Sequence, residues 1–318
     1  TRVKAVARRL LHLLVVLFFV TLFVALLTSM LPGDPTDAIA GFASEEQKAA
    51  LREELGLDDP VHVQYVRWMG DFVTGDLGGY YTVTGERPVM DRVRDSLPVS
   101  LQLMVYAQVL ALAVAVPAGV LTAYRAGSRG DRIANATAFG MLAVPNFALA
   151  LVLAYYVGVE LGWLPVSGYV RPGEDLVEHV RRMIMPAVSL AVGQIAVYMR
   201  LLRSDMIATL QEDFITMAKA KGVSPRRVLW RHALRPSSLT LLTVAGLNVG
   251  TLIGGAVIVE VIFSLPGVGL LLYEAIVSRQ YIALQSLVAI IAVGYVLINF
   301  LVDVLYAVLD PRIRHARA

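Results

Sequence analysis

The sequence predicts an all-α, polytopic membrane protein with about six transmembrane helices. The chain has 318 residues, is 57% hydrophobic and has a mean hydropathy of +0.66, which is too apolar for an ordinary soluble domain. Mostly apolar runs of about 20 residues, the length that a bilayer span requires, recur along it. Basic residues gather in short loops and acidic residues in one long loop, as the positive-inside bias produces in membrane proteins.

The predicted spans form a single membrane domain over residues 1–318, because no internal repeat or low-complexity linker divides the chain. They are expected at residues 10–31, 97–124, 133–160, 184–204, 237–262 and 284–309. The first could be mistaken for a signal peptide. Its apolar run is too long for one, however, and no A-x-A cleavage site follows it, so a retained span is expected.

Prolines inside three of the spans, Pro117, Pro145 and Pro186, favour kinks, because each removes a backbone hydrogen bond. Ordinary packing in a membrane protein explains any one of them equally well.

An acidic insertion, residues 32–96, is expected outside the cytoplasm between the first two spans. Ser44 and Gln47 have the spacing of a capping box, so a helix is expected over Ser44–Leu57. A second, amphipathic helix is expected over His62–Gly75. Two interpretations of the insertion stay open and do not exclude each other: it covers the helix bundle, or it receives another protein.

The loop of residues 205–236 carries seven basic residues from Arg203 to Arg235, so it and both termini are expected in the cytoplasm. Within it, residues 213–236, the docking segment, predict a pair of short helices. The first is expected to be capped by Asp213 and to stop at Gly222, and the second to start with Ser224 as N-cap and Pro225 as its first residue.

The positive-inside bias alone would explain the charge of the docking segment but not this order of caps. A docking surface for another protein is therefore the favoured interpretation. Its candidate residues are Asp213, Ala218, Lys221, Gly222, Ser224, Pro225, Arg227, Arg231, His232 and Leu234.

Polar residues and helix breakers in the last two spans suggest a pathway or gate. Glu260 is close enough to a span end that hydration by the interface is expected, so proton coupling is not. The run from Phe263 to Ile276 is predicted to form a re-entrant turn or outer gate, because proline and glycines interrupt it. The gate or pathway candidates are Asn248, Glu260, Pro266, Gly267, Gly269 and Asn299.

The motif search favours a chain without chemistry of its own. No G-x-x-x-x-G-K-[ST] loop and no G-x-S-x-G motif occurs, the five histidines lack metal-ligand spacing, and there is no cysteine. No catalytic residue, metal or cofactor is therefore expected on this chain. Nucleic-acid binding is not expected either, since the basic residues are divided among loops.

The string AKAKGVSPRRVLWRHALRP resembles the cytoplasmic EAA loop of bacterial ABC-importer permeases, in the form typical of the dipeptide/oligopeptide subfamily. Gly222, Ala218 and Leu234 match that pattern. The chain departs from it at Thr216, Met217, His232 and Arg235. Six further strings, in order, are similar to the same subfamily: LPGDP, LGLDDPVHVQYVRW, GDLG, LGWLPVSGY, GGAVIVEVIFSLPGVGLLL and LVDVLYAVLDPRIR.

The resemblance implies a permease subunit in the plasma (inner) membrane that forms half of a translocation pathway. It implies a second homologous permease subunit, two ATP-binding subunits that carry ATP and Mg, and an extracytoplasmic substrate-binding protein. The docking segment would then be a cytoplasmic coupling helix pair, and the cargo a dipeptide, a longer peptide, a glutathione-like compound or a metal chelate.

Two other classes remain open. An ion-gradient-driven secondary transporter usually shows inverted repeats and paired broken helices, which are not visible here. A membrane scaffold or receptor subunit without transport fits the kinked, glycine-rich spans least well.

Overall fold

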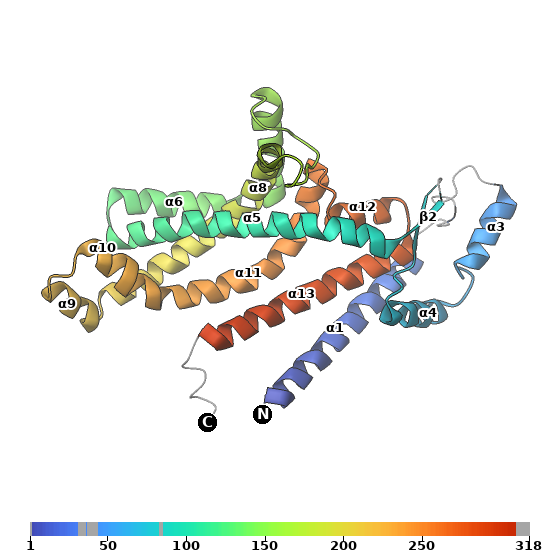
Figure 1. Cartoon of the computed structure of the whole chain (residues 1–318), viewed down its shortest axis with the longest axis horizontal. Helices are drawn as coiled ribbons and strands as arrows, with labels where there is room; N and C mark the ends of the chain where they lie inside the picture. Colours follow the sequence, from blue (N-terminus) through green and yellow to red (C-terminus); the bar gives the residue numbers. More distant parts are fainter. Residues whose placement is uncertain (1, 31–35, 37–43, 83–84, 310–318) are drawn as a thin grey trace. The chain divides into compact units, whose positions relative to one another are not determined.

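The computed structural model describes residues 2–30, 36, 44–82 and 85–309 (Figure 1). The LPGDP string and the basic tail after residue 309 therefore lie outside the described residues. The chain forms two compact units. Unit 1 comprises Thr1–Ser100 and Pro266–Leu297, and unit 2 comprises Leu101–Leu265 and Ile298–Ala318.

Unit 1 contains the insertion and the helices that support it. Its elements are α1 (Arg2–Ser29), α3 (Glu45–Glu54), α4 (Val61–Thr74), β1 (Gly79–Thr82), β2 (Gly85–Pro88), the start of α5 (Val89–Tyr124), α12 (Val268–Val277) and most of α13 (Tyr281–Leu309). Tyr65 and Trp68 of α4 are buried in one cluster with Ala25 of α1 and Ala289 of α13. The amphipathic helix is thus held by its aromatic face.

The two helices expected in the insertion are confirmed, and so are their end signals. Ser44 N–H donates to Gln47 Oε1 over 3.1 Å, and Gln47 N–H donates to Ser44 Oγ over 3.3 Å, which is the reciprocal pattern of a capping box. Gly56 and Gly75 follow α3 and α4 at φ of +61° and +94°, a conformation that glycine adopts without steric cost.

A two-stranded antiparallel hairpin follows α4, which the sequence analysis did not anticipate. Its register pairs Gly79 with Pro88 and Tyr81 with Glu86. Gln280 binds the backbone of Tyr81 from both sides: Tyr81 N–H donates to Gln280 Oε1 over 3.0 Å, and Gln280 Nε2 donates to Tyr81 O over 2.7 Å. The hairpin is therefore fixed to the start of α13.

Unit 2 is a helix bundle in which α8 packs against α6, α7 and α11. Its elements are the remainder of α5, α6 (Arg129–Ala143), α7 (Asn146–Leu153), the π-helix η1 (Ala154–Glu160), α8 (Leu176–Leu210), α9 (Asp213–Ala220), α10 (Pro225–Arg227), the π-helix η2 (Val228–Ala233), α11 (Leu234–Phe263) and the end of α13. Tyr198, Leu202 and Met206 of α8 are fully buried at its core.

The expected kink at Pro145 is a complete break. Val144, directly before it, has φ −94° and ψ 118°, because the proline ring disfavours the helical region for the preceding residue. Pro145 then serves as the N-cap of α7, and the two halves of the predicted span 133–160 meet at 95°. By contrast, Pro186 lies inside the helix α8.

Among the described residues, four helices are long and apolar enough to cross a membrane, or five if the bent pair is one span. The described apolar part of α1, Leu14–Ser29, is shorter. A polytopic helical membrane protein is therefore the fold class, and the predicted span limits stay predictions. The fourth helix is longer than the predicted 184–204, because Asp175 Oδ1 accepts the Glu178 N–H and caps it earlier.

Candidate functional site

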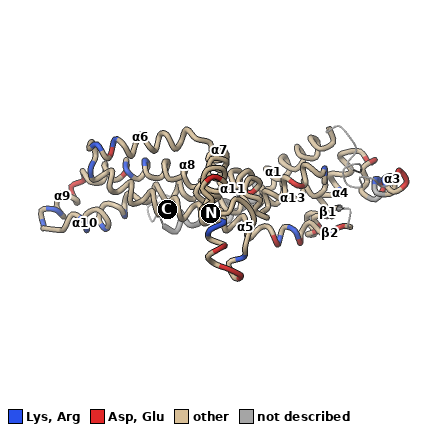
Figure 2. The backbone as a smooth tube through the Cα atoms, turned by 90° about the horizontal axis from the view of Figure 1, so that it is seen from above, with Lys and Arg blue, Asp and Glu red and all other residues tan. Residues whose placement is uncertain are grey.

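The docking segment lies at one end of unit 2, where α9 and α10 adjoin the turn between α5 and α6 (Figure 1). Lys and Arg gather at this end (Figure 2). A groove of about 430 Å³ separates these elements and is lined by the ends of α5 and α8 and by the turn between α9 and α10. The basic loop of the sequence is thus one surface.

The turn after α9 has the hydrogen bonds of a Schellman motif. Val223 N–H donates to Ala218 O over 3.2 Å, and Gly222 N–H donates to Lys219 O over 3.0 Å. Gly222 has φ +75°, as the motif requires of its left-handed residue. The predicted roles of Gly222 as the stop signal and of Pro225 as the first residue of the next helix are thereby confirmed.

The two predicted side-chain caps are wrong. Glu212, rather than Asp213, is the N-cap of α9, and its side chain makes no capping hydrogen bond. Ser224 is the N-cap of α10, but its side chain does not cap the helix; its backbone carbonyl accepts the Val228 N–H over 3.0 Å. Asp213 remains in the first turn, where a carboxylate favours the helix dipole.

The second helix of the predicted pair is not a separate short helix. Its start, α10, continues through the π-turn η2 into α11, so that a single helical run covers Pro225–Phe263. The π-turn lies next to Pro236, which cannot donate a backbone hydrogen bond and would clash with an α-helical carbonyl four residues before it. The docking segment is therefore continuous with the fifth predicted span.

The inward face of the docking segment belongs to the core of unit 2. Ile215 of α9 is fully buried, and Val228, Leu229 and Ala233 of η2 are buried with it. They share one apolar cluster with Leu202 of α8 and with residues of α5. Displacement of the docking segment must therefore displace residues of α5 and α8 as well, since packed cores deform little.

The outward face combines cations with large apolar side chains. Lys221, Arg227 and Arg231 are exposed, and no ion pair involves them within the described part of the chain. Three exposed apolar side chains were missed by the sequence analysis: Phe214 (46%), Met217 (58%) and Trp230 (42%). Phe214 and Met217 are three residues apart on α9, away from the buried Ile215, and this spacing was a readable signal. His232 and Leu234 are only half-buried.

A buried ion pair joins α6 to α8 within unit 2. Arg203 binds both carboxylate oxygens of Asp131 over 2.6 and 2.7 Å, and Asp131 also accepts hydrogen bonds from Gly127 N–H and Asn135 Nδ2. Such a bidentate pair fixes orientation as well as distance. Arg200, one turn earlier, lies 3.9 Å over the ring of Phe139. The arginines of α8 therefore hold α6 in place.

Polar side chains meet inside the bundle of unit 2. Asn248 Nδ2 donates to Gln194 Oε1 over 2.8 Å, joining α11 to α8. Tyr198 donates to Gln108 Oε1 over 3.1 Å, joining α8 to α5. Of the pathway candidates, Asn248 therefore has an interhelical partner, and hydrogen bonds between apolar helices specify how they pack.

The remaining gate and pathway candidates do not form one site. Pro266, Gly267 and Gly269 lie at the start of α12 in unit 1, whereas Asn248, Glu260 and Asn299 belong to unit 2. Asn248 and Glu260 are both on α11, about 18 Å apart at a rise of 1.5 Å per residue.

The expected hydration of Glu260 is wrong. The residue is only 1% exposed, because side chains of the fold enclose it despite its place three residues from the end of α11. Ser264 follows the helix in the left-handed conformation, at φ +50°, and the chain then turns into α12. The predicted interruption after Phe263 is therefore a turn between two helices.

Outside the bundle, the loop before α8 has its own polar cluster. Tyr169 donates to Gln102 Oε1 over 2.9 Å, and its ring meets the buried His179 edge-on. Burial raises the pKa of the Tyr169 phenol, so this group stays protonated and can donate near neutral pH. Within the described residues, no group of three or more metal-ligating side chains occurs.

Two family comparisons cover nearly the whole chain. Residues 115–315 match the family described as binding-protein-dependent transport system inner membrane component. Residues 2–104 match the N-terminal part of a binding-protein-dependent transport system membrane component.

Known relatives cover the chain from end to end. A probable peptide ABC transporter permease protein of Sinorhizobium fredii is 38% identical over 98% of this chain and 99% of its own length. An oligopeptide transport system permease protein of Bacillus subtilis is 36% identical over 98% and 99%. A glutathione transport system permease protein of Escherichia coli is 36% identical over 98% of both chains.

Proposed function

Because the chain belongs to the family of binding-protein-dependent inner membrane transport components, and is a permease subunit of an ABC transporter, we propose that it imports di- or oligopeptides. The chain is an integral inner-membrane protein, and its family is not itself catalytic. It would form half of the pathway beside a second homologous permease. Two separate ATP-binding subunits would supply ATP and Mg, and an extracytoplasmic binding protein would deliver the peptide.

The docking segment carries this proposal. Its outward face offers Arg227, Arg231 and the exposed Phe214, Met217 and Trp230, a mixture of arginine and large apolar groups that is typical of protein interfaces. Its inward face is part of the core of unit 2. A partner bound outside would thus act on the helices inside.

The work done by the partner would reach the pathway through this core. ATP binding would close the two ATP-binding subunits and move α9 together with the start of the Pro225–Phe263 run. Since α8 and α5 pack on the same cluster, the helices would tilt between inward-facing and outward-facing states. Hydrolysis and product release would reset them. Two states biased by a distant ligand are what such coupling requires.

Peptide cargo is supported by the relatives, two of which are described as peptide permeases. One relative of similar identity is a glutathione permease, itself a peptide-like compound. No observation favours the ion-gradient-driven transporter over the ATP-driven importer.

Reversing two charges tests the docking function. In the reconstituted complex, Arg227→Glu with Arg231→Glu should leave the chain in the membrane. It should reduce binding-protein-stimulated ATP hydrolysis and peptide uptake together by about tenfold or more, which corresponds to about 1.4 kcal/mol of lost interaction. Both side chains are exposed, so folding should not suffer.

The matched control is Arg125→Glu with Arg132→Glu, which changes the same charge on the exposed turn beside the docking segment. Its effect should be clearly smaller. Full stimulation in the Arg227/Arg231 variant at normal membrane levels would exclude the docking segment as the route of coupling.

A further inference from the structure

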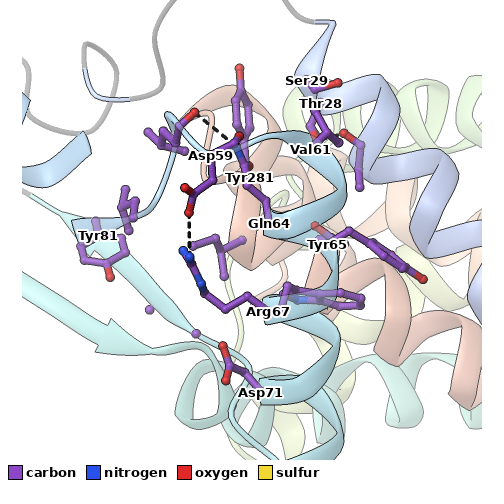
Figure 3. Close-up of a pocket in the computed structure, with 18 of the residues that line it drawn as sticks. Thr28, Ser29, Asp59, Val61, Gln64, Tyr65, Arg67, Asp71, Tyr81 and Tyr281 are labelled. Carbon is purple, nitrogen blue, oxygen red and sulfur yellow. Dashed lines mark hydrogen bonds and ion pairs between the residues drawn. The ribbon is translucent and has the colours of Figure 1, made fainter. Parts of the chain in front are cut away.

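Unit 1 encloses a cavity of about 860 Å³ (Figure 3). Its walls come from the end of α1, from α3 and α4, from the hairpin β1–β2 and from the start of α13, all within unit 1. In Figure 3, Arg67 reaches toward Asp59 on one side, and Tyr81 faces the space from the hairpin. The cavity has the size of a small-molecule or short-peptide site.

Buried hydrogen bonds hold these walls in position. Trp68 Nε1 donates to Ser286 Oγ over 2.9 Å, and Ser286 Oγ donates to Leu77 O over 2.8 Å, which links α4, α13 and the loop before β1. Gln280 binds both backbone groups of Tyr81. Because partners far apart in sequence are satisfied together, the cavity is a product of the fold and not of one loose loop.

The two cations of the cavity wall are already neutralised. Arg52 pairs with Asp58 over 2.5 Å, and Arg67 pairs with Asp59 over 2.6 Å. Each pair contributes no net charge to the cavity.

Three further carboxylates that line the cavity are Asp71, Asp76 and Glu86. Among the described residues, no salt bridge neutralises any of them, although Asp76 accepts the Gly78 N–H over 2.9 Å. Unbalanced charge of one sign in a concave site attracts ligands of the opposite sign. The cavity therefore selects for cations.

A buried amide supplies a second, independent sign of a ligand. Gln285 lines the cavity and is only 8% exposed, yet its Nε2 has no hydrogen-bond partner within the described structure. A buried donor without an acceptor costs free energy, and a carbonyl oxygen is the acceptor that would satisfy it. The aromatic side chains of Tyr65, Trp68 and Tyr81 add apolar and cation-attracting wall.

We propose that this cavity binds a positively charged peptide. Its ammonium or guanidinium groups would lie against Asp71, Asp76 and Glu86, and a backbone carbonyl would accept from Gln285. Only the choice of a peptide, rather than another amine with carbonyl groups, rests on the proposed function. The site would give the permease a binding step of its own on the extracytoplasmic insertion.

Direct binding tests this site on the detergent-solubilised complex, without binding protein and without ATP. Trilysine, triglutamate and acetyl-trialanine-amide are titrated by calorimetry. Trilysine should bind at least about tenfold more tightly than the other two, a difference of about 1.4 kcal/mol. Raising the salt concentration should weaken the binding of trilysine, because screening reduces the attraction between partly exposed charges.

The variant Asp71→Asn with Glu86→Gln should weaken trilysine binding by about tenfold or more. The matched control is Glu46→Gln with Asp95→Asn, two exposed carboxylates of unit 1 that do not line the cavity. It should change the affinity by less than about twofold. Equal binding of the three peptides, or equal effects of the two variants, would overturn the proposal.

The same variants separate this site from neighbouring explanations. If trilysine does not bind, but Asp71→Asn with Glu86→Gln weakens association with the binding protein, the cavity receives that protein and the free-peptide proposal is wrong. The Arg227→Glu/Arg231→Glu variant should still bind trilysine while it loses uptake. Unchanged uptake in a complex that fails to bind trilysine would remove the cavity site alone and leave the proposed function intact.

Discussion

Gly222 illustrates how far single residues determine the docking segment. Its φ of +75° and the two hydrogen bonds around it set the angle at which the chain leaves α9. A Cβ at this position would meet no atom within 4 Å, so the site is restricted by backbone conformation and not by space. Sequence reasoning located this turn correctly, because glycine after a basic helix end is a strictly local signal.

We predict different outcomes for two substitutions at this position. Gly222→Val should reduce binding-protein-stimulated ATP hydrolysis several-fold, because the left-handed conformation costs a residue with a side chain about 1–2 kcal/mol and a β-branched one more. Gly222→Asn should remain close to the wild type, since asparagine tolerates this conformation. Equal activity of both variants at equal membrane levels would show that the turn angle does not matter for coupling.

Local signals failed where the outcome depends on tertiary contacts. Asp213 and Ser224 are good cap residues by type, yet neither side chain caps its helix in the fold. Glu260 was expected to be hydrated from its place in the sequence, but other parts of the fold enclose it. Distance from a helix end predicts exposure only when nothing packs against that end.

At the scale of the element, α9 has two faces with different tasks. Ile215 points into the core of unit 2 and is fully buried, whereas Phe214 and Met217 are exposed. The amphipathic period of α9 is visible in the sequence, but it does not say which apolar residues face the protein's own core. A helix that is apolar on two sides requires a partner on each.

Matched truncations on α9 should separate these tasks. Ile215→Ala should destabilise unit 2 by about 2–4 kcal/mol, as cavity-forming substitutions in cores do, and should lower the melting temperature in detergent. Phe214→Ala with Met217→Ala should leave the melting temperature unchanged and weaken co-purification of the ATP-binding subunits. If the exposed pair lowered the melting temperature and Ile215→Ala did not, the two faces would be assigned the wrong way round.

Secondary structure of low regularity escaped the sequence analysis altogether. The strands of the hairpin are only four residues each, too short for a reliable alternating pattern, although Tyr80, Tyr81 and Thr82 have the right residue types. The two π-helices gave no signal that sequence periodicity could reveal. Long apolar helices, by contrast, were located in the expected places, because burial in lipid imposes a pattern over about 20 residues.

At the scale of the whole molecule, the charge distribution predicts how the chain is inserted. Since the chain has no cysteine, single cysteines are direct reporters. Ser44 at the start of α3 and Ser224 in the docking segment are both exposed. With an impermeant thiol reagent on intact cells, Ser44→Cys should be labelled, and Ser224→Cys should be labelled only after the membrane is permeabilised. The opposite pattern would invert the predicted topology.

The unbroken helical run Pro225–Phe263 has a geometric consequence. Arg227 and Asn248 lie on one rod, about 32 Å apart at a rise of 1.5 Å per residue. If the rod turns about its axis at one end, the side chains at the other end point in a new direction, without any sliding between helices. The π-turn η2 introduces about one extra residue, an angular offset of roughly 100° between the two faces. Removing one residue there would keep both ends helical but aim the amide of Asn248 away from Gln194.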